Sequence, residues 1–252
     1  MIVYSQARRE IVDACLWLAE RGFLAATGGN VSLRVDADLL AVTPSAVDYY
    51  SMSPEDICIV RLNTLEVVAG GLKPSIECGL HAALLRLRQD AAAVIHTHQP
   101  MASAVALLNL PLITATVADR QAIGDRIDIV PYAPSGTWML VRALKRRLKR
   151  EVHAYLLRNH GLICCGTTLE EALSRTEVVE RVAAGFLHDV IEQAVAAGQG
   201  NDLLAYALEA LDRARKSRVV PAAALADSSS LGGPEGSAGG ISRGPENDSP
   251  PR

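Results

Sequence analysis

The chain lacks the features that identify membrane, secreted and nucleic-acid-binding proteins. None of its apolar runs reaches the roughly 20 residues that cross a bilayer, and residues 1–5 do not have the layout of a signal peptide. With 25 lysines and arginines against 28 aspartates and glutamates, the formal net charge is only −3, which provides no electrostatic footprint for nucleic acid or an anionic membrane. We therefore expect a cytoplasmic protein that binds neither nucleic acid nor a membrane.

Cysteine is present but forms no recognisable framework. The five cysteines are an odd number without the spacing of a disulfide scaffold, and no Cys-x-x-Cys pair offers a metal site. Such thiols are typical of a reducing compartment, where most of them pack as small hydrophobic side chains. The adjacent Cys164 and Cys165 are predicted to point to opposite faces of a strand, and neither is expected to bind a metal.

Three of the six histidines follow apolar runs. His96 and His98 come after the run at residues 91–95, which predicts a buried strand, and side chains two positions apart on a strand share one face. His160 also follows an apolar run, and the next residue, Gly161, would let the backbone and a substrate approach closely. Three imidazoles at strand ends with an exchangeable fourth position describe a catalytic zinc better than a structural one.

The other histidines are weaker candidates, because a lone histidine is more often an ordinary core or surface residue than a ligand. We expect His81 to lie in a helix, either behind the metal ligands or in the core. His153 and His188 are predicted to lie at the surface.

Helical and strand signals alternate along the chain. Residues 31–34 with 39–42, and residues 57–62 with 65–69, are predicted strand pairs, and turns this short join only antiparallel strands. Helices are predicted over residues 5–21, 75–88, 101–108 and 137–149 and from residue 168, and further strands over 113–116 and 127–130. The pattern predicts a three-layer α/β/α sandwich with a central, largely antiparallel sheet.

One folded domain is predicted over residues 1–220, since 252 residues can bury a sizeable core. Glycine, serine and proline make up 16 of the 25 residues from Ser228 to Arg252. Such a composition cannot bury enough apolar surface to order itself, so residues 221–252 are predicted to be a disordered tail without chemistry.

Short motifs occur in a characteristic order along the chain. They are Gly28-Gly29-Asn30-Val31-Ser32, Thr43-Pro44-Ser45, Lys73-Pro74-Ser75-Ile76-Glu77, His96-Thr97-His98, Asn159-His160-Gly161 and, further on, Gly166-Thr167-Thr168-Leu169-Glu170-Glu171-Ala172. This combination resembles the class II aldolase/adducin family, most closely its fuculose-phosphate aldolase branch, over about residues 5–195. The resemblance implies a central antiparallel sheet flanked by helices. It also implies a homotetramer with four-fold symmetry and active sites between subunits.

The resemblance further implies a metal site and a catalytic carboxylate. It places zinc ligands at His96, His98 and His160. It also implies that Glu77 is the catalytic acid–base and that this carboxylate binds zinc when no substrate is present. In the sequence itself, Ser75 is predicted to cap a helix that has Glu77 in its first turn. Zinc would polarise a ketone and stabilise the enediolate formed when the carboxylate removes the adjacent proton. Mn²⁺, Fe²⁺ and Co²⁺ bind to similar sites, so zinc is the preferred metal in this prediction but these three are alternatives.

A pocket for a substrate phosphate is implied by two turns and a predicted helix start. Backbone N–H groups at such places bind anions, and asparagine and serine side chains add donors. The candidate residues are Gly29, Asn30, Ser45, Ala46, Ser75 and Ile76.

Three positions depart from the pattern of this branch. Ile76 stands where a second serine is usual and Ala46 where a glycine is usual, which alters two phosphate contacts. By ungapped alignment, Val117 stands where a tyrosine lent by a neighbouring subunit usually acts as general acid toward the aldehyde. Asp119 and Arg120 are close in sequence and could supply a proton or polarise an oxygen.

The leading interpretation is an aldolase that reversibly cleaves a ketose 1-phosphate to dihydroxyacetone phosphate and an aldehyde. A ribulose-phosphate 4-epimerase shares the fold but typically has aspartate at the position of Glu77. A methylthioribulose-1-phosphate dehydratase could use the same metal and carboxylate and would differ in its products. A non-catalytic adducin-like module has no need of metal ligands, whereas all three histidines are present.

Overall fold

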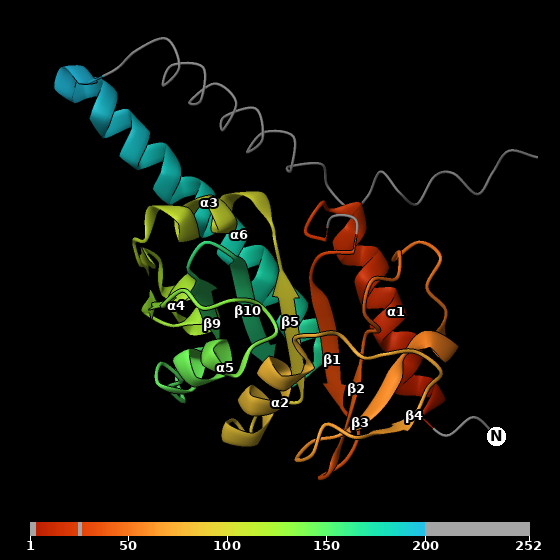
Figure 1. Cartoon of the computed structure of the whole chain (residues 1–252). Helices are drawn as coiled ribbons and strands as arrows, with labels where there is room; N and C mark the ends of the chain where they lie inside the picture. The colour runs from red at the N-terminus through yellow and green to blue at the C-terminus, as the bar shows by residue number, and fades with distance from the viewer. Residues whose placement is uncertain (1–3, 25–26, 200–252) are drawn as a thin grey trace, which may run out of the picture.

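A twisted sheet forms the centre of the structure, a computed structural model that describes residues 4–24 and 27–199 (Figure 1). Within these residues its strands are β1 (Asn30–Arg34), β2 (Leu39–Val42), β3 (Cys58–Arg61), β4 (Val67–Ala69), β5 (Ala93–Thr97), β8 (Ile129–Val130), β9 (Ala154–Leu157) and β10 (Gly161–Gly166). They are ordered β4-β3-β2-β1-β5-β10-β9-β8, and only the β8–β9 pair is parallel. A small second sheet pairs β6 (Leu112–Ile113) with β7 (Arg126–Ile127). The predicted boundary at residue 220 and the predicted tail lie outside the described residues.

Helices cover both faces of the central sheet (Figure 1). One face packs against α2 (Cys78–Leu87) and α5 (Trp138–Lys145). The other face packs against α1 (Ser5–Glu20), α3 (Pro100–Leu108), α4 (Val117–Ile123) and α6 (Leu169–Ala194). A short 3₁₀ helix, Pro54–Asp56, precedes β3, and a π-helical turn, Val195–Gln199, follows α6. This arrangement confirms the predicted three-layer α/β/α sandwich.

The two-residue period of the strands sorts side chains between the two faces. Cys164 packs in the apolar cluster under α3 and α6, whereas Cys165 packs in the cluster under α2 and α5, as predicted. All five cysteines are free and buried. On β5 the same alternation puts Val94 on the α2 side, and His96, two residues on, shares that side.

The segment between β6 and β7 corrects one prediction. A strand was expected at residues 113–116, but only Ile113 is paired, and residues 117–123 form α4. The hydroxyl of Thr116 accepts a hydrogen bond from the N–H of Asp119 at 3.1 Å, which caps the helix, and Gly124 ends it with a φ of +100°. This local capping outweighs the β-branched residues that suggested a strand.

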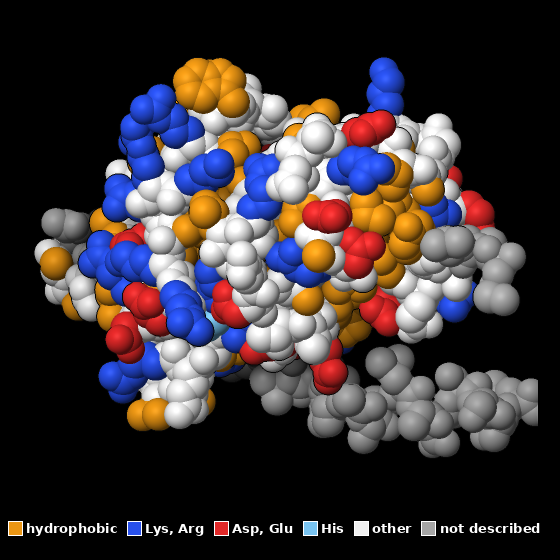
Figure 2. All heavy atoms as spheres, turned by 90° about the horizontal axis from the view of Figure 1, so that it is seen from below, with side chains coloured by type: hydrophobic (Ala, Val, Ile, Leu, Met, Phe, Trp, Pro, Cys, Tyr) orange, Lys and Arg blue, Asp and Glu red, His pale blue; other side chains and the backbone are white. Residues whose placement is uncertain are grey.

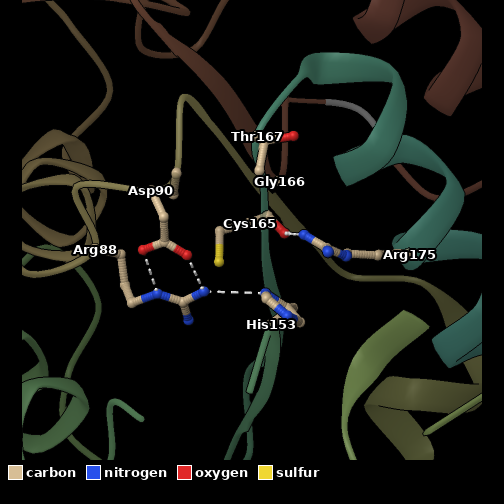
Figure 3. A pocket seen from close by; sticks show the side chains of 8 residues that line it. Arg88, Asp90, His153, Cys165, Gly166, Thr167 and Arg175 are labelled. Carbon is tan, nitrogen blue, oxygen red and sulfur yellow. Dashed lines mark hydrogen bonds and ion pairs between the residues drawn. The ribbon is translucent and has the colours of Figure 1, made fainter. Parts of the chain in front are cut away.

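Arg88, which follows α2, ties this helix to the end of the sheet remote from His96 (Figure 3). Its buried guanidinium donates from Nη1 to the carbonyl oxygens of Lys149 at 2.9 Å and Val152 at 2.6 Å, and pairs through two bonds with Asp90. The adjoining cavity has about 10 Å³ of water-accessible space, which is room for about one water molecule. The cluster therefore stabilises the fold and does not form a ligand site.

The same cluster overturns a prediction about histidine. Nη2 of Arg88 donates to Nδ1 of His153 at 3.0 Å, and His153 is half-buried rather than at the surface (Figure 3). Burial, together with the charge of Arg175, lowers the pKa of His153 to about 4, so the ring stays a neutral acceptor. His188 on α6 is also only partly exposed, so both histidines are less exposed than the surface positions predicted for them.

We expect Arg88→Met to lower the free energy of unfolding by about 3–5 kcal/mol, because it leaves Asp90 and two carbonyl oxygens without their cationic donor. Urea unfolding measures this loss. Arg61→Met is the matched control, since its ion pair with Glu66 is exposed and contributes less than about 1 kcal/mol. Equal stabilities of the two variants would contradict the role given to Arg88.

The surface carries charges of both signs. On the face shown in Figure 2, basic and acidic side chains are interspersed among apolar ones, in keeping with the near balance of the whole sequence. Among the described residues, no helix has both the length and the hydropathy that a membrane crossing requires.

Candidate metal centre and active site

Three imidazoles meet where β5 ends beside the β9–β10 hairpin. His96 lies in β5, His98 follows it, and His160 lies in the hairpin turn. Antiparallel pairing of β10 with β5, with Ile163 opposite His96, brings the turn to this place. Nε2 of His96 and Nε2 of His98 are 3.0 Å apart, and the ligand atoms of all three rings lie within 4.8 Å of one another. The structure thus brings together the three predicted ligands.

The carboxylate of Glu77 completes the cluster. Glu77 is the N-cap residue of α2, and its side chain is 4% exposed. Its Oε2 lies 3.1 Å from Nε2 of His96, and its Oε1 lies 3.3 Å from Nε2 of His160. Ligand atoms bound tetrahedrally to zinc at about 2.0–2.1 Å stand about 3.3 Å from one another. These residues therefore fit a zinc-sized ion.

The histidine at the centre is held in the tautomer that a metal needs. Nδ1 of His96 donates to the carbonyl oxygen of Leu162 at 2.7 Å, which leaves Nε2 to face the cluster with its lone pair. Burial lowers the pKa of His96 and of His98, so both rings are neutral at physiological pH. Neutral imidazoles are the form that binds metal.

Two glycines let neighbouring backbone approach the end of β5 closely. A Cβ atom at Gly29, which has a φ of +92°, would lie 2.8 Å from the carbonyl oxygen of His96. A Cβ atom at Gly161 would collide with the carbonyl oxygen of Thr97 and lie 2.8 Å from Cδ2 of His98. The close approach predicted at Gly161 is therefore made to β5 itself, and it fixes the position of the candidate ligands His98 and His160.

Two further side chains hold the Glu77 carboxylate. Asn30 donates from Nδ2 to Oε2 at 2.9 Å, and the hydroxyl of Ser135 donates to Oε1 at 2.8 Å. Burial opposes ionisation of Glu77, but the positive charge that His96 and His160 carry when protonated, together with these two donors, outweighs it and lowers the pKa of the carboxyl below its ordinary value. Glu77 is therefore ionised at neutral pH. Ser135 was not predicted, because its contact joins residues far apart in the sequence.

The candidate phosphate residues lie on three adjacent segments. Pro44 and Pro74 form an isolated antiparallel bridge, and the N–H of Ser45 donates to the carbonyl oxygen of Lys73 at 2.9 Å. The N–H of Thr43 donates to the carbonyl oxygen of Val31 at 3.1 Å, which brings the segment of Gly29 and Asn30 alongside. The structure therefore places the predicted turns together, on the side of Glu77.

The details of these segments correct two expectations. Ser75 does not cap a helix, because its N–H donates to Thr43, its hydroxyl accepts from the N–H of Glu77, and α2 begins only at Cys78. The N–H groups of Ser45 and Ser75 are both used within the protein, so an anion would depend on neighbouring donors.

The two altered phosphate positions differ in their surroundings. Ala46 has a φ of +58°, a left-handed conformation that favours glycine, so the backbone keeps the form that a glycine would allow. Ile76 is 66% exposed and presents an apolar side chain next to Glu77.

The residues proposed to replace the tyrosine lie on the face of the sheet opposite α2 and Glu77. Val117, Asp119 and Arg120 lie on α4, which packs against α6 on the face of the sheet opposite α2. Asp119 pairs with Arg181, which lowers the pKa of its carboxyl.

Comparison with known proteins agrees with this geometry. The sequence profile of the family described as Class II Aldolase and Adducin N-terminal domain matches residues 9–187. A 5-deoxy-D-ribulose 1-phosphate aldolase of Bacillus thuringiensis serovar kurstaki is 34% identical over 183 residues, 71% of this chain and 83% of that protein. An L-fuculose phosphate aldolase of Escherichia coli K12 is 36% identical over 181 residues, 71% and 81% of the two chains. The solved structure of L-fuculose-1-phosphate aldolase from Thermus thermophilus superposes with a TM-score of 0.65 at 25% identity, covering 78% of this chain and 99% of its own.

Proposed function

The chain belongs to the class II aldolase and adducin family, and we propose that it is a zinc-dependent aldolase that reversibly cleaves a ketose 1-phosphate to dihydroxyacetone phosphate and an aldehyde. That it is a lyase of the class II aldolase type follows from its aldolase relatives. The observation that supports the finer proposal is the ionised carboxylate of Glu77 beside the clustered imidazoles of His96, His98 and His160.

His96, His98 and His160 would hold the zinc, with Glu77 as a fourth ligand until substrate arrives. Bound zinc supplies Lewis-acid polarisation of the substrate ketone. In the cleavage direction, the 4-hydroxyl of the ketose gives up its proton, the C3–C4 bond breaks and the aldehyde leaves, and one proton is returned through the carboxyl of Glu77 to C3 of the enediolate. In the synthetic direction, the Glu77 carboxylate removes that proton from the hydroxymethyl carbon of dihydroxyacetone phosphate.

The chain's own contacts prepare Glu77 for this proton transfer. Asn30 and Ser135 orient the carboxylate, and burial excludes water that would compete for it. For the phosphate we propose Gly29, Asn30, Ser45, Ala46, Ser75 and Ile76, on the three adjacent segments. The exposed apolar side chain of Ile76 donates no hydrogen bond, so phosphate would be held by fewer side-chain donors here than where a serine stands.

A panel of ketose phosphates with coupled detection of dihydroxyacetone phosphate tests this function. The panel includes L-fuculose 1-phosphate and 5-deoxy-D-ribulose 1-phosphate, on which the relatives act according to their names. The zinc-loaded protein is expected to release dihydroxyacetone phosphate from at least one ketose, and the release is expected to stop after chelation. A product formed by loss of water instead would favour the dehydratase.

We further propose a homotetramer with active sites between subunits. Leu107 on α3, Ile113 on β6 and Val117 on α4 are 65%, 56% and 63% exposed, and large apolar side chains left open in this way favour a protein interface. The position of α4, remote from the metal ligands of its own chain, also favours a site completed by a neighbour.

Light scattering is expected to give four times the monomer mass for the wild type and a smaller mass for Leu107→Glu/Ile113→Glu, because charges introduced into an apolar interface must be desolvated. Leu87→Glu is the matched control, since Leu87 is 54% exposed on the opposite layer and the substitution should leave the mass unchanged. A wild-type protein with the monomer mass at low concentration would contradict the shared site.

A further inference from the structure

We propose that Ser135 is a positioning residue that sets the plane of the Glu77 carboxylate; this rests on the proposed function, in which Glu77 binds zinc and transfers the proton. The hydroxyl of Ser135 donates to Oε1 at 2.8 Å, and the amide of Asn30 donates to Oε2 at 2.9 Å. Each carboxylate oxygen therefore has one protein donor and one facing imidazole, His96 for Oε2 and His160 for Oε1.

Ser135 lies in the loop before α5, and contacts on both sides of it hold this hydroxyl in place. Thr137 caps α5 by accepting from the N–H of Leu140, and its own hydroxyl donates to the carbonyl oxygen of Pro134 at 2.6 Å. Gly136 has a φ of +72°, and a Cβ atom there would lie 3.3 Å from both Cβ and the carbonyl oxygen of Ile76. The helix cap therefore fixes one side of Ser135, and packing on the residue before Glu77 fixes the other.

A carboxylate needs such a second contact to have one orientation. The last torsion of a glutamate side chain is broad and roughly two-fold, so the side chain itself does not define the plane of its oxygens. The hydrogen bond from Asn30 fixes the position of Oε2, but the carboxylate can still rotate about that one contact. Ser135 removes this freedom and keeps Oε1 on the side of His160. Partners that orient a metal ligand in this way typically affect metal affinity or activity by about 10–100-fold.

Zinc binding by the apoprotein, measured in competition with a chromophoric chelator, tests the inference without a substrate. Ser135→Ala is expected to raise the zinc dissociation constant about tenfold, and Ser135→Thr, which keeps the hydroxyl, is expected to restore it. Ser51→Ala is the matched control, because it removes an exposed loop hydroxyl that bonds only within its own turn.

A second comparison separates positioning from a general effect on stability. In a Glu77→Ala background the carboxylate is gone, so adding Ser135→Ala is expected to change zinc affinity no further. Wild-type affinity in Ser135→Ala, or the same tenfold loss without the carboxylate, would overturn the inference while leaving the proposed function standing. A wild-type protein that binds no zinc would overturn the proposed function, and the inference with it.

Discussion

Glu77→Gln is expected to retain zinc while it abolishes the exchange of the hydroxymethyl proton of dihydroxyacetone phosphate with solvent. The glutamine side chain keeps the size of glutamate, and its amide can still accept from Asn30 and donate to the oxygen of Ser135, whose hydroxyl also accepts. What it cannot do is take up the proton. General-base catalysis typically contributes about 10²–10⁴-fold, so we expect a loss of this size in the exchange rate at saturating substrate.

Deuterium incorporation followed by proton NMR measures this rate, and elemental analysis of the same sample measures zinc. Glu177→Gln is the control, since its carboxylate is half exposed and pairs with Arg21 away from the metal ligands. Exchange at the wild-type rate in the zinc-loaded Glu77→Gln protein would remove Glu77 from the reaction.

His96→Ala is expected to lose the metal rather than only the rate. Structural zinc sites of four protein ligands bind zinc with about 10–16 kcal/mol at neutral pH, so one ligand accounts for about 2.5–4 kcal/mol, or about 10²–10³-fold in affinity. His96 also lies between Glu77 and His98, and removing its ring separates the remaining ligands.

The matched control removes a histidine from the other group of possible ligands among the described residues. His188 lies on α6 beside Asp189 and Glu192, whose carboxylates are mostly exposed. His188→Ala is therefore expected to keep stoichiometric zinc. If His188→Ala loses zinc and His96→Ala keeps it, the metal centre has been placed on the wrong element.

Local periodicity explains the site residues that could be predicted from the sequence. His96 and His98 share a face because strand side chains alternate, and the same rule separates Cys164 from Cys165. His160 was proposed as the third ligand because it also follows an apolar run, but whether it joins the other two depends on which strands pair. The family resemblance implied it, and the pairing of β10 with β5 achieves it.

Interactions between distant segments explain what the sequence could not reveal. Ser75 was expected to cap a helix. Its N–H instead donates to the carbonyl oxygen of Thr43 beside the antiparallel Pro44–Pro74 bridge, and α2 begins three residues later, at Cys78. Asn30 was expected to contact phosphate, yet its amide donates to Glu77 from the start of β1. The sequence predicted only the helix that begins at Thr137, and nothing local indicates that Ser135 reaches a carboxylate 58 positions away.

The most direct test of the account is the fate of the C3 hydrogens of dihydroxyacetone phosphate in deuterium oxide, with wild-type protein before and after zinc is removed. Glu77 is held in one orientation on one side of the imidazole cluster, so it can reach only one of the two hydrogens. The zinc-loaded protein is expected to replace one hydrogen per molecule, and the metal-free protein is expected to replace none. No exchange with stoichiometric zinc in place would contradict the aldolase mechanism.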